Sequence, residues 1–355
     1  MHNRPKKRIL VAPLNWGLGH ATRCIPLIQA LVANSFEPVI ASDGVALKLL
    51  QKEFPNLETV NLPSYNISYP KNGQFFKLKM LQNSPKLIKA ITAEKKATET
   101  IVKDYSIDGI LSDNRLGVHD KHIPCVFMTH QLKVLSGNTT WLSTKMHQKI
   151  ITRFDECWVP DTIGDDNLSG ELGHSDSVGI TLKYIGPLSR FKKSERQLKY
   201  DLLVLLSGPE PQRTLLEKLL LKELEMYHGN VLFIKGVVDG ESKASINKHI
   251  TIYNFMTSDA LENAINESKI ILSRSGYTTV MDLAKLEKKA FFIPTPGQFE
   301  QEYIAKRLTK LGFVPSCDQK EFKIEMLNSV DDFRGLHLTE YTTNYKKLFR
   351  LFQGE

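Results

Sequence analysis

Residues 270–282 read IILSRSGYTTVMD, and the order of residue types in this stretch suggests both a local fold and a ligand. The apolar run Ile270 to Leu272 predicts a buried strand, and a helical pattern begins near Thr278. A strand that passes through a small-residue turn into a helix presents backbone N–H groups and the positive end of the helix dipole to an anion. Asp282 lies one turn into this helix, where its carboxylate could accept hydrogen bonds from a vicinal diol such as ribose.

A second motif follows on the next predicted strand, Ala290 to Ile293. This strand ends in a proline-rich loop that carries Glu300 and Gln301, whose side chains could hydrogen-bond sugar hydroxyls. Groups suited to phosphate, ribose and sugar therefore occur in that order along the chain, which suggests a nucleotide-sugar site.

Composition sets the limits of this interpretation. The chain has 355 residues, which is long for one core and sufficient for two domains. Its net charge of +8 favours anionic partners such as nucleic acid, an anionic membrane or phosphorylated substrates. The four scattered cysteines lack the spacing of metal ligands or of a redox motif, so we expect the protein to reside in the reducing cytoplasm.

The first apolar stretch, Ile9 to Leu14, is too short for a signal peptide, and no run approaches the roughly 20 apolar residues of a membrane span.

Short apolar strands alternate with helical patterns through both halves of the chain, beginning with the strand Ile9 to Ala12. This alternation predicts parallel sheets with helices on both faces and ligands at the carboxyl ends of the strands. The turn-rich, charged segment from Gly186 to Lys193 interrupts the pattern and resembles a linker. We therefore predict an α/β protein of two tandem Rossmann-like, doubly wound domains facing a central cleft. Their expected bounds are 1–186 and 187–335, with residues 336–355 forming a helix that packs back on the N-terminal domain.

The loop between the first strand and the first helix contains Gly17, Gly19 and His20. Two glycines allow the backbone to approach a ligand closely, and the helix N-terminus favours an anion. The third glycine of the dinucleotide fingerprint is replaced by Thr22, which argues against a nicotinamide or flavin site. His20 could act as a general base or could simply cap the turn, and the sequence leaves both open.

Three further polar positions follow predicted strands. Asp113 and His130 each come directly after an apolar run, so either could orient His20 or bind an acceptor, and either could equally be ordinary loop polarity. Ser207 and Gly208 open the first crossover of the second half and could meet a phosphate, although two nearby prolines remove N–H donors.

Residues 71–96 form the one strongly basic segment, in which seven lysines and several apolar residues stand against a single acid, Glu94. Such a stretch could lie on an anionic membrane with its apolar side inserted. It could also be a helix packed on the sheet with its lysines in solvent. Both interpretations stay open.

The motifs Ser-Arg-Ser-Gly-x-x-Thr-Val-x-Asp and Pro-x-Pro-x-x-x-x-Gln, within residues 273–301, resemble those of GT-B-fold glycosyltransferases of family 28. This group includes the N-acetylglucosaminyltransferase of peptidoglycan synthesis. The Gly-x-Gly-His loop and the domain order extend the resemblance more weakly over most of the chain. The resemblance implies a nucleotide diphosphate sugar donor, usually a UDP-sugar, held mainly by the C-terminal domain. It also implies transfer of a hexose or N-acetylhexosamine to a glycan or lipid-linked acceptor. We expect an inverting transfer without a cofactor and, because no Asp-x-Asp metal motif occurs in a plausible site, without a metal ion.

The resemblance also assigns roles to individual residues. It implies that Ser275 and Gly276 contact the diphosphate and that Asp282 binds the ribose, at a position where the family has glutamate. Arg190 would lie near the nucleotide, and His20 matches a histidine proposed as base or acceptor-phosphate ligand. The complete set of expected site residues is His20 and Asp113 as catalytic groups and, for substrate binding, Gly17, Gly19, His130, Arg190, Ser207, Gly208, Phe255, Met256, Ser275, Gly276, Tyr277, Thr278, Asp282, Glu300 and Gln301.

Two departures from the family pattern point away from peptidoglycan. The family's Gly-Gly-Ser-Gln-Gly loop is replaced by residues 207–211, SGPEP, and the His-Glu-Gln-Asn segment of the peptidoglycan enzyme by residues 129–132, THQL. We therefore expect another acceptor, such as a polysaccharide or glycolipid precursor. Two alternatives stay open, namely a UDP-sugar 2-epimerase of the same fold and a non-catalytic nucleotide- or membrane-binding protein. We expect a cytoplasmic location, which could be peripheral on the inner face of the membrane through Lys71 to Lys96, and no nucleic-acid partner.

Overall fold

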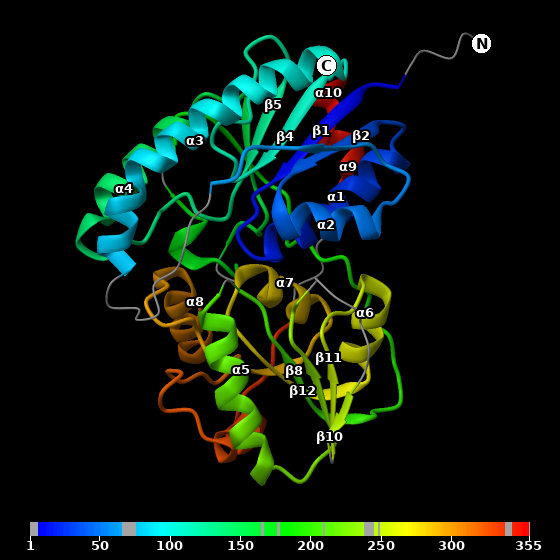
Figure 1. Ribbon diagram of the computed structural model, residues 1–355, viewed down its shortest axis with the longest axis vertical. Coiled ribbons are helices and arrows are strands. Elements are labelled where there is room, and N and C mark those ends of the chain that lie inside the picture. The colour runs from blue at the N-terminus through cyan, green and yellow to red at the C-terminus, as the bar shows by residue number, and fades with distance from the viewer. Residues whose placement is uncertain are drawn as a thin grey trace. The chain divides into compact units, whose positions relative to one another are not determined.

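A computed structural model describes residues 6–65, 76–164, 167–175, 178–208, 210–237, 245–247, 249–337 and 343–354 of the chain. It divides the chain into two compact α/β units (Figure 1). The described residues of the first unit fall within Met1–Ile67, Leu81–Leu188 and Glu340–Glu355, and those of the second within Ser68–Met80 and Ser189–Thr339. The end of the chain therefore belongs to the first unit.

The first unit is built on a seven-stranded parallel sheet with the order β3-β2-β1-β4-β5-β6-β7. The strand order reverses between β1 and β4, so the carboxyl ends of these two strands mark the position where doubly wound sheets bind ligands. The edge strand β7 had no clear sequence signal, because its residues are only half-buried. The strands are β1 (Arg8–Pro13), β2 (Glu37–Ser42), β3 (Thr59–Asn61), β4 (Gly109–Asp113), β5 (Cys125–Met128), β6 (Glu156–Val159) and β7 (Thr181–Tyr184).

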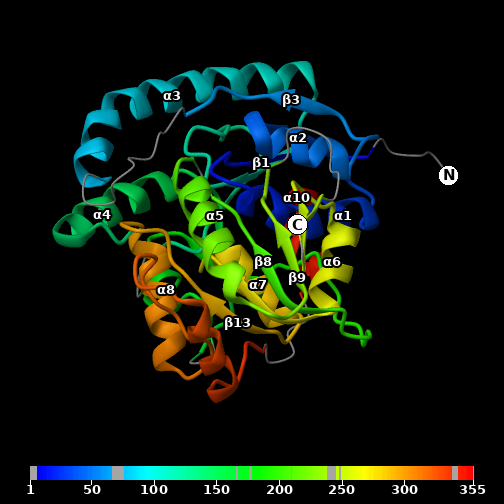
Figure 2. The same ribbon diagram turned by 60° about the horizontal axis from the view of Figure 1, so that its bottom comes forward.

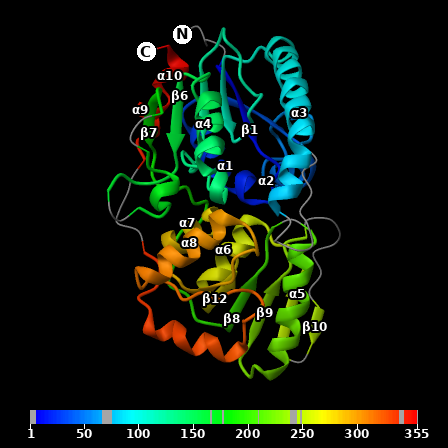
Figure 3. The ribbon, with the colours of Figure 1, turned by 90° about the vertical axis from the view of Figure 1, so that its left-hand side faces the viewer.

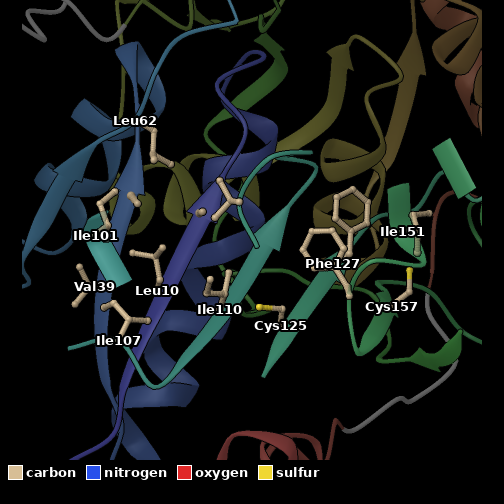
Figure 4. Packing of buried hydrophobic residues seen from close by; sticks show 14 of the residues in the cluster. Leu10, Val39, Leu62, Ile101, Ile107, Ile110, Cys125, Phe127, Ile151 and Cys157 are labelled. Atoms are coloured by element: carbon tan, nitrogen blue, oxygen red, sulfur yellow. The ribbon is translucent and has the colours of Figure 1, made fainter. Parts of the chain in front are cut away.

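Helices cover both faces of this sheet. Alternate strand residues such as Leu10, Ile110 and Phe127 form one core cluster together with Ile101 of α3 and Ile151 of α4 (Figure 4). The intervening residues point to the opposite face because strand side chains alternate. Figure 3 shows α3 and α4 alongside the strands. The first four helices are α1 (Gly19–Ala33), α2 (Gly44–Glu53), α3 (Phe76–Asp104) and α4 (Thr140–Ile151), with 3₁₀ turns at Gly137–Thr139 and Gly170–Leu172.

The described part of the basic segment packs as a helix on the first unit. Residues 71–75 and the side chains of residues 76–86 lie outside the described structure. Further along α3, Glu94, Thr98 and Ile101 are buried, whereas the lysines at 89, 95 and 96 are exposed. This part of the segment therefore follows the second interpretation, a helix on the sheet with its lysines in solvent.

The chain ends in two four-residue helices, α9 (Tyr345–Leu348) and α10 (Arg350–Gln353), where the sequence pattern predicted one longer helix over residues 336–355. Of that range, residues 338–342 and residue 355 lie outside the described structure. Phe349 and Phe352 are fully buried, and their rings contact Trp158 with centroids 6.2 and 6.0 Å away. Helices this short depend on tertiary packing, so the two buried rings account for the structure of the tail.

The second unit has a six-stranded sheet with the order β10-β11-β9-β8-β12-β13, in which β10 is antiparallel to its neighbour and the other strands are parallel. Its strand order reverses between β8 and β12. The strands are β8 (Tyr200–Leu205), β9 (Val231–Ile234), β10 (Ser245–Asn247), β11 (Ile250–Tyr253), β12 (Ser268–Ser273) and β13 (Lys289–Phe292).

Helices also flank the second sheet on both sides. Figure 2 shows α5 on one side and α6 on the other, and α5 contributes Leu216 and Leu220 to the core cluster of its face. The helices are α5 (Gln212–Glu223), α6 (Ser258–Asn266), α7 (Tyr277–Lys285) and α8 (Phe299–Lys310), with 3₁₀ turns at Leu224–Met226 and Ile324–Asp332. The turn between β12 and α7 lies at the strand-order reversal, where doubly wound sheets bind ligands.

Candidate functional site

A buried polar cluster lies at the carboxyl ends of β4 and β5 in the first unit. Arg23 of α1 is 1% exposed, and its guanidinium grips the Asp113 carboxylate at two points, with Nε 2.8 Å from Oδ2 and Nη2 bonded to Oδ1. The same guanidinium reaches two histidines, with Nη1 2.9 Å from His130 Nδ1 and Nη2 3.0 Å from His20 Nδ1. Asp113 Oδ2 is also 3.2 Å from His20 Nδ1. The predicted residues His20, Asp113 and His130 thus come together, with Arg23 among them.

The electrostatics of this cluster favour an ionised Asp113 and a neutral His20. Burial by itself would raise the pKa of Asp113, but the Arg23 guanidinium and His20 hold that pKa well below its usual range. Burial lowers the pKa of His20 below its ordinary value of 6.5, although Asp113 opposes this shift. His20 keeps 14% of its side chain exposed. It is therefore an uncharged imidazole at neutral pH that solvent or a ligand can reach.

The glycine loop before His20 is held by a second buried network. Gly17 has a φ of 79°, a conformation that favours glycine, and Gly19 is the first residue of α1. Asn15 in the same loop donates to Asp43 at 3.0 Å and accepts from the backbone of α2. Asp43 in turn accepts from the fully buried Arg115 at 2.8 Å. The loop is thus tied to the ends of β2 and β4.

Arg115 is also the buried partner of Glu94, the single acidic residue of the basic segment. Its Nε donates to Glu94 Oε1 at 2.5 Å, and Tyr65 donates to the other oxygen at 2.6 Å. The backbone N–H of Gly117 donates to Glu94 as well, at 2.7 Å. Because a buried charge needs a partner, Glu94 belongs to the interior of the first unit.

In the second unit, the turn between β12 and α7 combines a helix N-terminus with an open glycine. Gly276 precedes the nine-residue α7 in an extended conformation with φ −66°. A Cβ placed on Gly276 would lie 3.9 Å from Thr279 Oγ1 and 4.0 Å from Gln301 Nε2, which are ordinary contacts. Ser275 donates to the backbone oxygen of Gln301 at 2.8 Å. The fold itself therefore does not require glycine at this position.

The side chains of Arg274 and Gln301 hold the turn in place through hydrogen bonds to neighbouring loops. Arg274 is fully buried, and its guanidinium donates to the backbone oxygens of Pro294 and Gln212 at 2.9 and 3.1 Å. Burial lowers the pKa of Arg274 to about 9. Gln301 accepts from the backbone N–H of Thr295 at 2.8 Å through Oε1. Both residues thereby fix the loop after β13 against the turn.

Asp282 lies on the buried side of α7, with 9% of the residue exposed. Its Oδ1 accepts a hydrogen bond from Ser189 at 2.7 Å. Burial raises the pKa of Asp282 to about 6, and nearby Arg190 opposes this shift. The Arg190 guanidinium lies over the ring of Phe191, 4.7 Å from its centroid. The structure thus brings Asp282 and Arg190 together, with Ser189 as an additional partner.

The other expected residues of the second unit lie at strand ends or in a first helical turn. Parallel strands end at one edge of a sheet, so β8, β11, β12 and β13 bring these positions to the same edge. Within the described ranges, no three His, Cys, Asp or Glu side chains are grouped so that they could hold a metal ion. The positions are Ser207 and Gly208 after β8, Phe255 and Met256 after β11, Tyr277 and Thr278 at the start of α7, and Glu300 at the start of α8.

Known proteins similar to this chain are glycosyltransferases. Residues 216–346 match the glycosyltransferase family 28 C-terminal domain. An uncharacterized glycosyltransferase of Methanopyrus kandleri is 22% identical over 320 residues, which cover 83% of this chain and 85% of that protein. The UDP-N-acetylglucosamine–N-acetylmuramyl-(pentapeptide) pyrophosphoryl-undecaprenol N-acetylglucosamine transferase of Haemophilus ducreyi is 22% identical over 65% of each chain.

This chain is a glycosyltransferase whose residues 216–346 match the family 28 C-terminal domain. Solved structures agree on the GT-B fold. Acinetobacter baumannii MurG aligns with a TM-score of 0.56 at 13% identity, over 99% of this chain and 100% of its own. The glycosyltransferase SnogD from Streptomyces nogalater aligns with a TM-score of 0.58 at 14% identity, over 98% and 94% of the two chains. The predicted fold and family are thereby confirmed.

Sequence reasoning missed two residues of this glycosyltransferase that hold the candidate site groups. Arg23 is a charged residue on the apolar face of α1, three positions after His20, and this placement was the available signal. Ser189 stands beside Arg190 in the linker, but nothing in the sequence indicated that it would bond to Asp282, 93 positions away.

Proposed function

We propose that this glycosyltransferase moves a hexose or N-acetylhexosamine from a nucleotide diphosphate sugar, with a UDP-sugar as the favoured donor, to a glycan or lipid-linked acceptor. The observation that carries the proposal is the turn from Ser273 to Gly276, where a helix N-terminus and a glycine open to a ligand coincide with the strand-order reversal. The Haemophilus relative is named for a UDP-N-acetylglucosamine donor, and SpnG and SsfS6, two GT-B neighbours, were solved with thymidine diphosphate.

The donor would lie along the carboxyl edge of the second sheet. Its diphosphate would face the N-terminus of α7, where the helix dipole favours negative charge. Asp282 Oδ1 is occupied by Ser189, and no other hydrogen bond to this carboxylate occurs within the described structure, so Oδ2 would accept from the ribose. Gln301 uses Oε1 for Thr295, so it would offer its Nε2 amide to the donor, beside Glu300.

The chemistry that we propose is a single displacement at the anomeric carbon, which inverts its configuration. The acceptor oxygen forms the new bond to this carbon, and the bond to the diphosphate oxygen breaks with its electron pair. His20 takes the proton of the acceptor hydroxyl on Nε2, while Asp113 orients the ring from Nδ1. The α7 dipole and the Arg190 guanidinium would stabilise the charge that grows on the diphosphate, so the proposed reaction needs no metal ion.

We also propose that the first unit docks on an anionic membrane, where a lipid-linked acceptor would be found. The outer side of α4 exposes Trp141, Leu142 and Met146, each by more than half. Lys145 lies over the Trp141 ring at 4.5 Å, and Lys149 is exposed on the same helix. Aromatic and apolar groups flanked by lysines suit an interfacial helix on anionic lipid. No helix in the described ranges has the length and hydropathy needed to cross a bilayer.

Calorimetric titration with UDP and thymidine diphosphate tests the donor site directly. We expect saturable binding of one or both, followed by acceptor-dependent release of nucleoside diphosphate from the matching sugar donor. NMR of the product would report the anomeric configuration, and a chelator should leave the rate unchanged. Conversion of a UDP-sugar without any acceptor would favour the epimerase alternative, and lack of binding at saturating nucleotide would refute the proposal.

A further inference from the structure

In the first unit, His20 and His130 are joined by one buried arginine, Arg23, which the proposed chemistry does not use. We propose that Arg23 is a positioning residue that fixes the proton of His130 on Nε2 and keeps His20 uncharged beside Asp113. The inference rests on the proposed role of His20 as base, because an uncharged imidazole is the form that can accept a proton.

The hydrogen-bonding capacity of arginine determines the form of His130. A guanidinium carries five N–H donors and no acceptor. Arg23 Nη1 lies 2.9 Å from His130 Nδ1, so this nitrogen must contribute a lone pair to the contact. The proton of a neutral imidazole is then on the other nitrogen. His130, which is 3% exposed, is thereby held as the Nε2–H form.

His20 Nδ1 has two partners, of which one requires this atom to accept a hydrogen bond and the other requires it to donate one. Arg23 Nη2 lies 3.0 Å from His20 Nδ1 and can only donate, whereas the Asp113 carboxylate lies 3.2 Å away and can only accept. A proton on Nδ1 satisfies Asp113 and leaves Nε2 bare, which is the form a base needs. A bare Nδ1 satisfies Arg23 and leaves the proton on Nε2. Each contact is thus met by one neutral form of the ring.

Charge balance explains why neither form needs a second proton. In a simple histidine–aspartate pair, the carboxylate would favour an imidazolium. Here Arg23 already neutralises Asp113 through a buried two-point contact, so an imidazolium at His20 would leave a net positive charge in the interior. Arg23 thus cancels the electrostatic attraction by which Asp113 would stabilise a charged His20.

The other titratable groups around the cluster do not favour a protonated, charged His20 either. Cys24 Sγ lies 3.7 Å from Asp113 Oδ2, and burial raises the pKa of this thiol, so it stays neutral. His130 acts on His20 in the same direction as Arg23, since a charge on either would oppose a charge on the other. Burial lowers the pKa of His147 of α4 to about 4, and the charge of His130 acts in the same direction. Asp113 is therefore the one anion acting on His20 in the described structure.

The proton positions can be observed without any substrate or mutation. Long-range proton–nitrogen correlation spectra of histidine-labelled protein distinguish protonated from bare ring nitrogens, and His20→Gln and His130→Gln variants assign the two signals. At pH 7 we expect a bare Nδ1 and a protonated Nε2 for His130, and a neutral ring for His20. An imidazolium at His20, or a protonated Nδ1 at His130, would overturn the proposal whether or not glycosyl transfer is ever detected.

Arg23 variants then test the consequence for turnover. In Arg23→Gln, the carboxylate loses its cation and His20 becomes its natural partner, so the acidic limb of the kcat/KM profile should move up by at least about one pH unit. Arg23→Lys keeps the positive charge but loses the two-point contact with Asp113, so its acidic limb should move less. This second variant keeps the test possible if Arg23→Gln does not fold. Arg153→Gln, with the same charge change at an exposed position, is the matched control. Unshifted acidic limbs in folded Arg23 variants would contradict the proposal.

Discussion

The hydroxyl of Ser189 lies 2.7 Å from Oδ1 of Asp282, and this contact joins the segment entering the second unit to helix α7. The backbone N–H of Phe191 donates to the same hydroxyl at 3.1 Å, so the serine is itself held in place. The carboxylate that we assign to the ribose therefore has a fixed orientation before any donor binds. Preorganisation of this kind lowers the cost of ordering a site on binding.

The pKa of Asp282 leads to a stability prediction. Its folded pKa of about 6 lies above its ordinary value of 3.8, so the folded protein binds this proton more tightly than the unfolded chain does. The stabilisation is fully present below pH 3.8 and is lost as the pH rises to about 6. Relative to Asp282→Asn, which does not titrate, the natural protein should lose up to about 3 kcal/mol between pH 3.5 and pH 7. Urea unfolding of both proteins measures this, with Asp332→Asn as an exposed control; parallel pH profiles would contradict the pKa.

Gly276→Ala tests whether glycine at this position is required for ligand binding rather than for stability of the fold. The backbone at Gly276 suits alanine, and the added Cβ would make only ordinary contacts, so the free energy of unfolding should change by less than about 1 kcal/mol. A diphosphate seated against this turn would meet the new methyl group. We expect UDP affinity to fall at least tenfold by calorimetry. Equal affinity in a folded Gly276→Ala protein would place the diphosphate elsewhere.

His20→Gln tests the proposed base. Loss of a general base typically lowers turnover by about 10²–10⁴-fold, whereas donor binding on the second unit should be unchanged. Initial rates at saturating donor and acceptor, together with the UDP dissociation constant, distinguish the two effects. His228→Gln makes the same substitution at an exposed position of the second unit. Full turnover without the His20 imidazole would end its assignment as base.

Phe352→Ala tests the attachment of the C-terminal segment. Phe352 is fully buried, and its ring lies so close to the backbone that a Cβ on Gly109 would come within 2.6 Å of it. Removal of such a ring typically costs about 3–5 kcal/mol. We expect chemical denaturation to show a loss of this size. A change below about 1 kcal/mol would mean that the tail contributes little to the first unit.

The exposed face of α4 can be tested with vesicles. The double variant Trp141→Ser and Met146→Ser removes apolar groups that contact little of the protein, so stability should be retained. Co-sedimentation with vesicles containing anionic lipid should fall several-fold, and the remaining binding should weaken with salt. Leu198→Ser is a matched control, because Leu198 is an exposed apolar residue of the second unit. Undiminished sedimentation of the double variant would exclude α4 as the docking face.

Much of the fold could be predicted from sequence because it depends on local pattern. Parallel strands buried on both faces are continuous apolar runs, as at Ile270 to Leu272, and the turns after them carry small or polar residues. The edge strand at Thr181–Tyr184 escaped notice because half-buried residues need not be apolar. The tail was read as one helix, since spacing alone does not show where tertiary contacts interrupt a short helix.

The candidate site was only partly predictable, because its side chains meet across long sequence distances. The neighbourhood of His20, Asp113 and His130 followed from their positions at strand ends. Arg23 joins all three, but a pattern of residues cannot show that its guanidinium turns inward toward a carboxylate 90 positions away. Glu94 is a similar case: its solitary position among lysines was visible, whereas its buried contact with Arg115 was not.

The placement of Phe349 and Phe352 on the first unit has a consequence for biosynthesis. The surface of Trp158 that receives them is made long before they are, since residues 189–342 are translated in between. At the usual pace of about 5–20 residues per second, this apolar surface stays uncovered on the nascent chain for roughly ten to thirty seconds. The second unit can be complete during that interval, so the half of the protein that emerges first from the ribosome is the last to close its core.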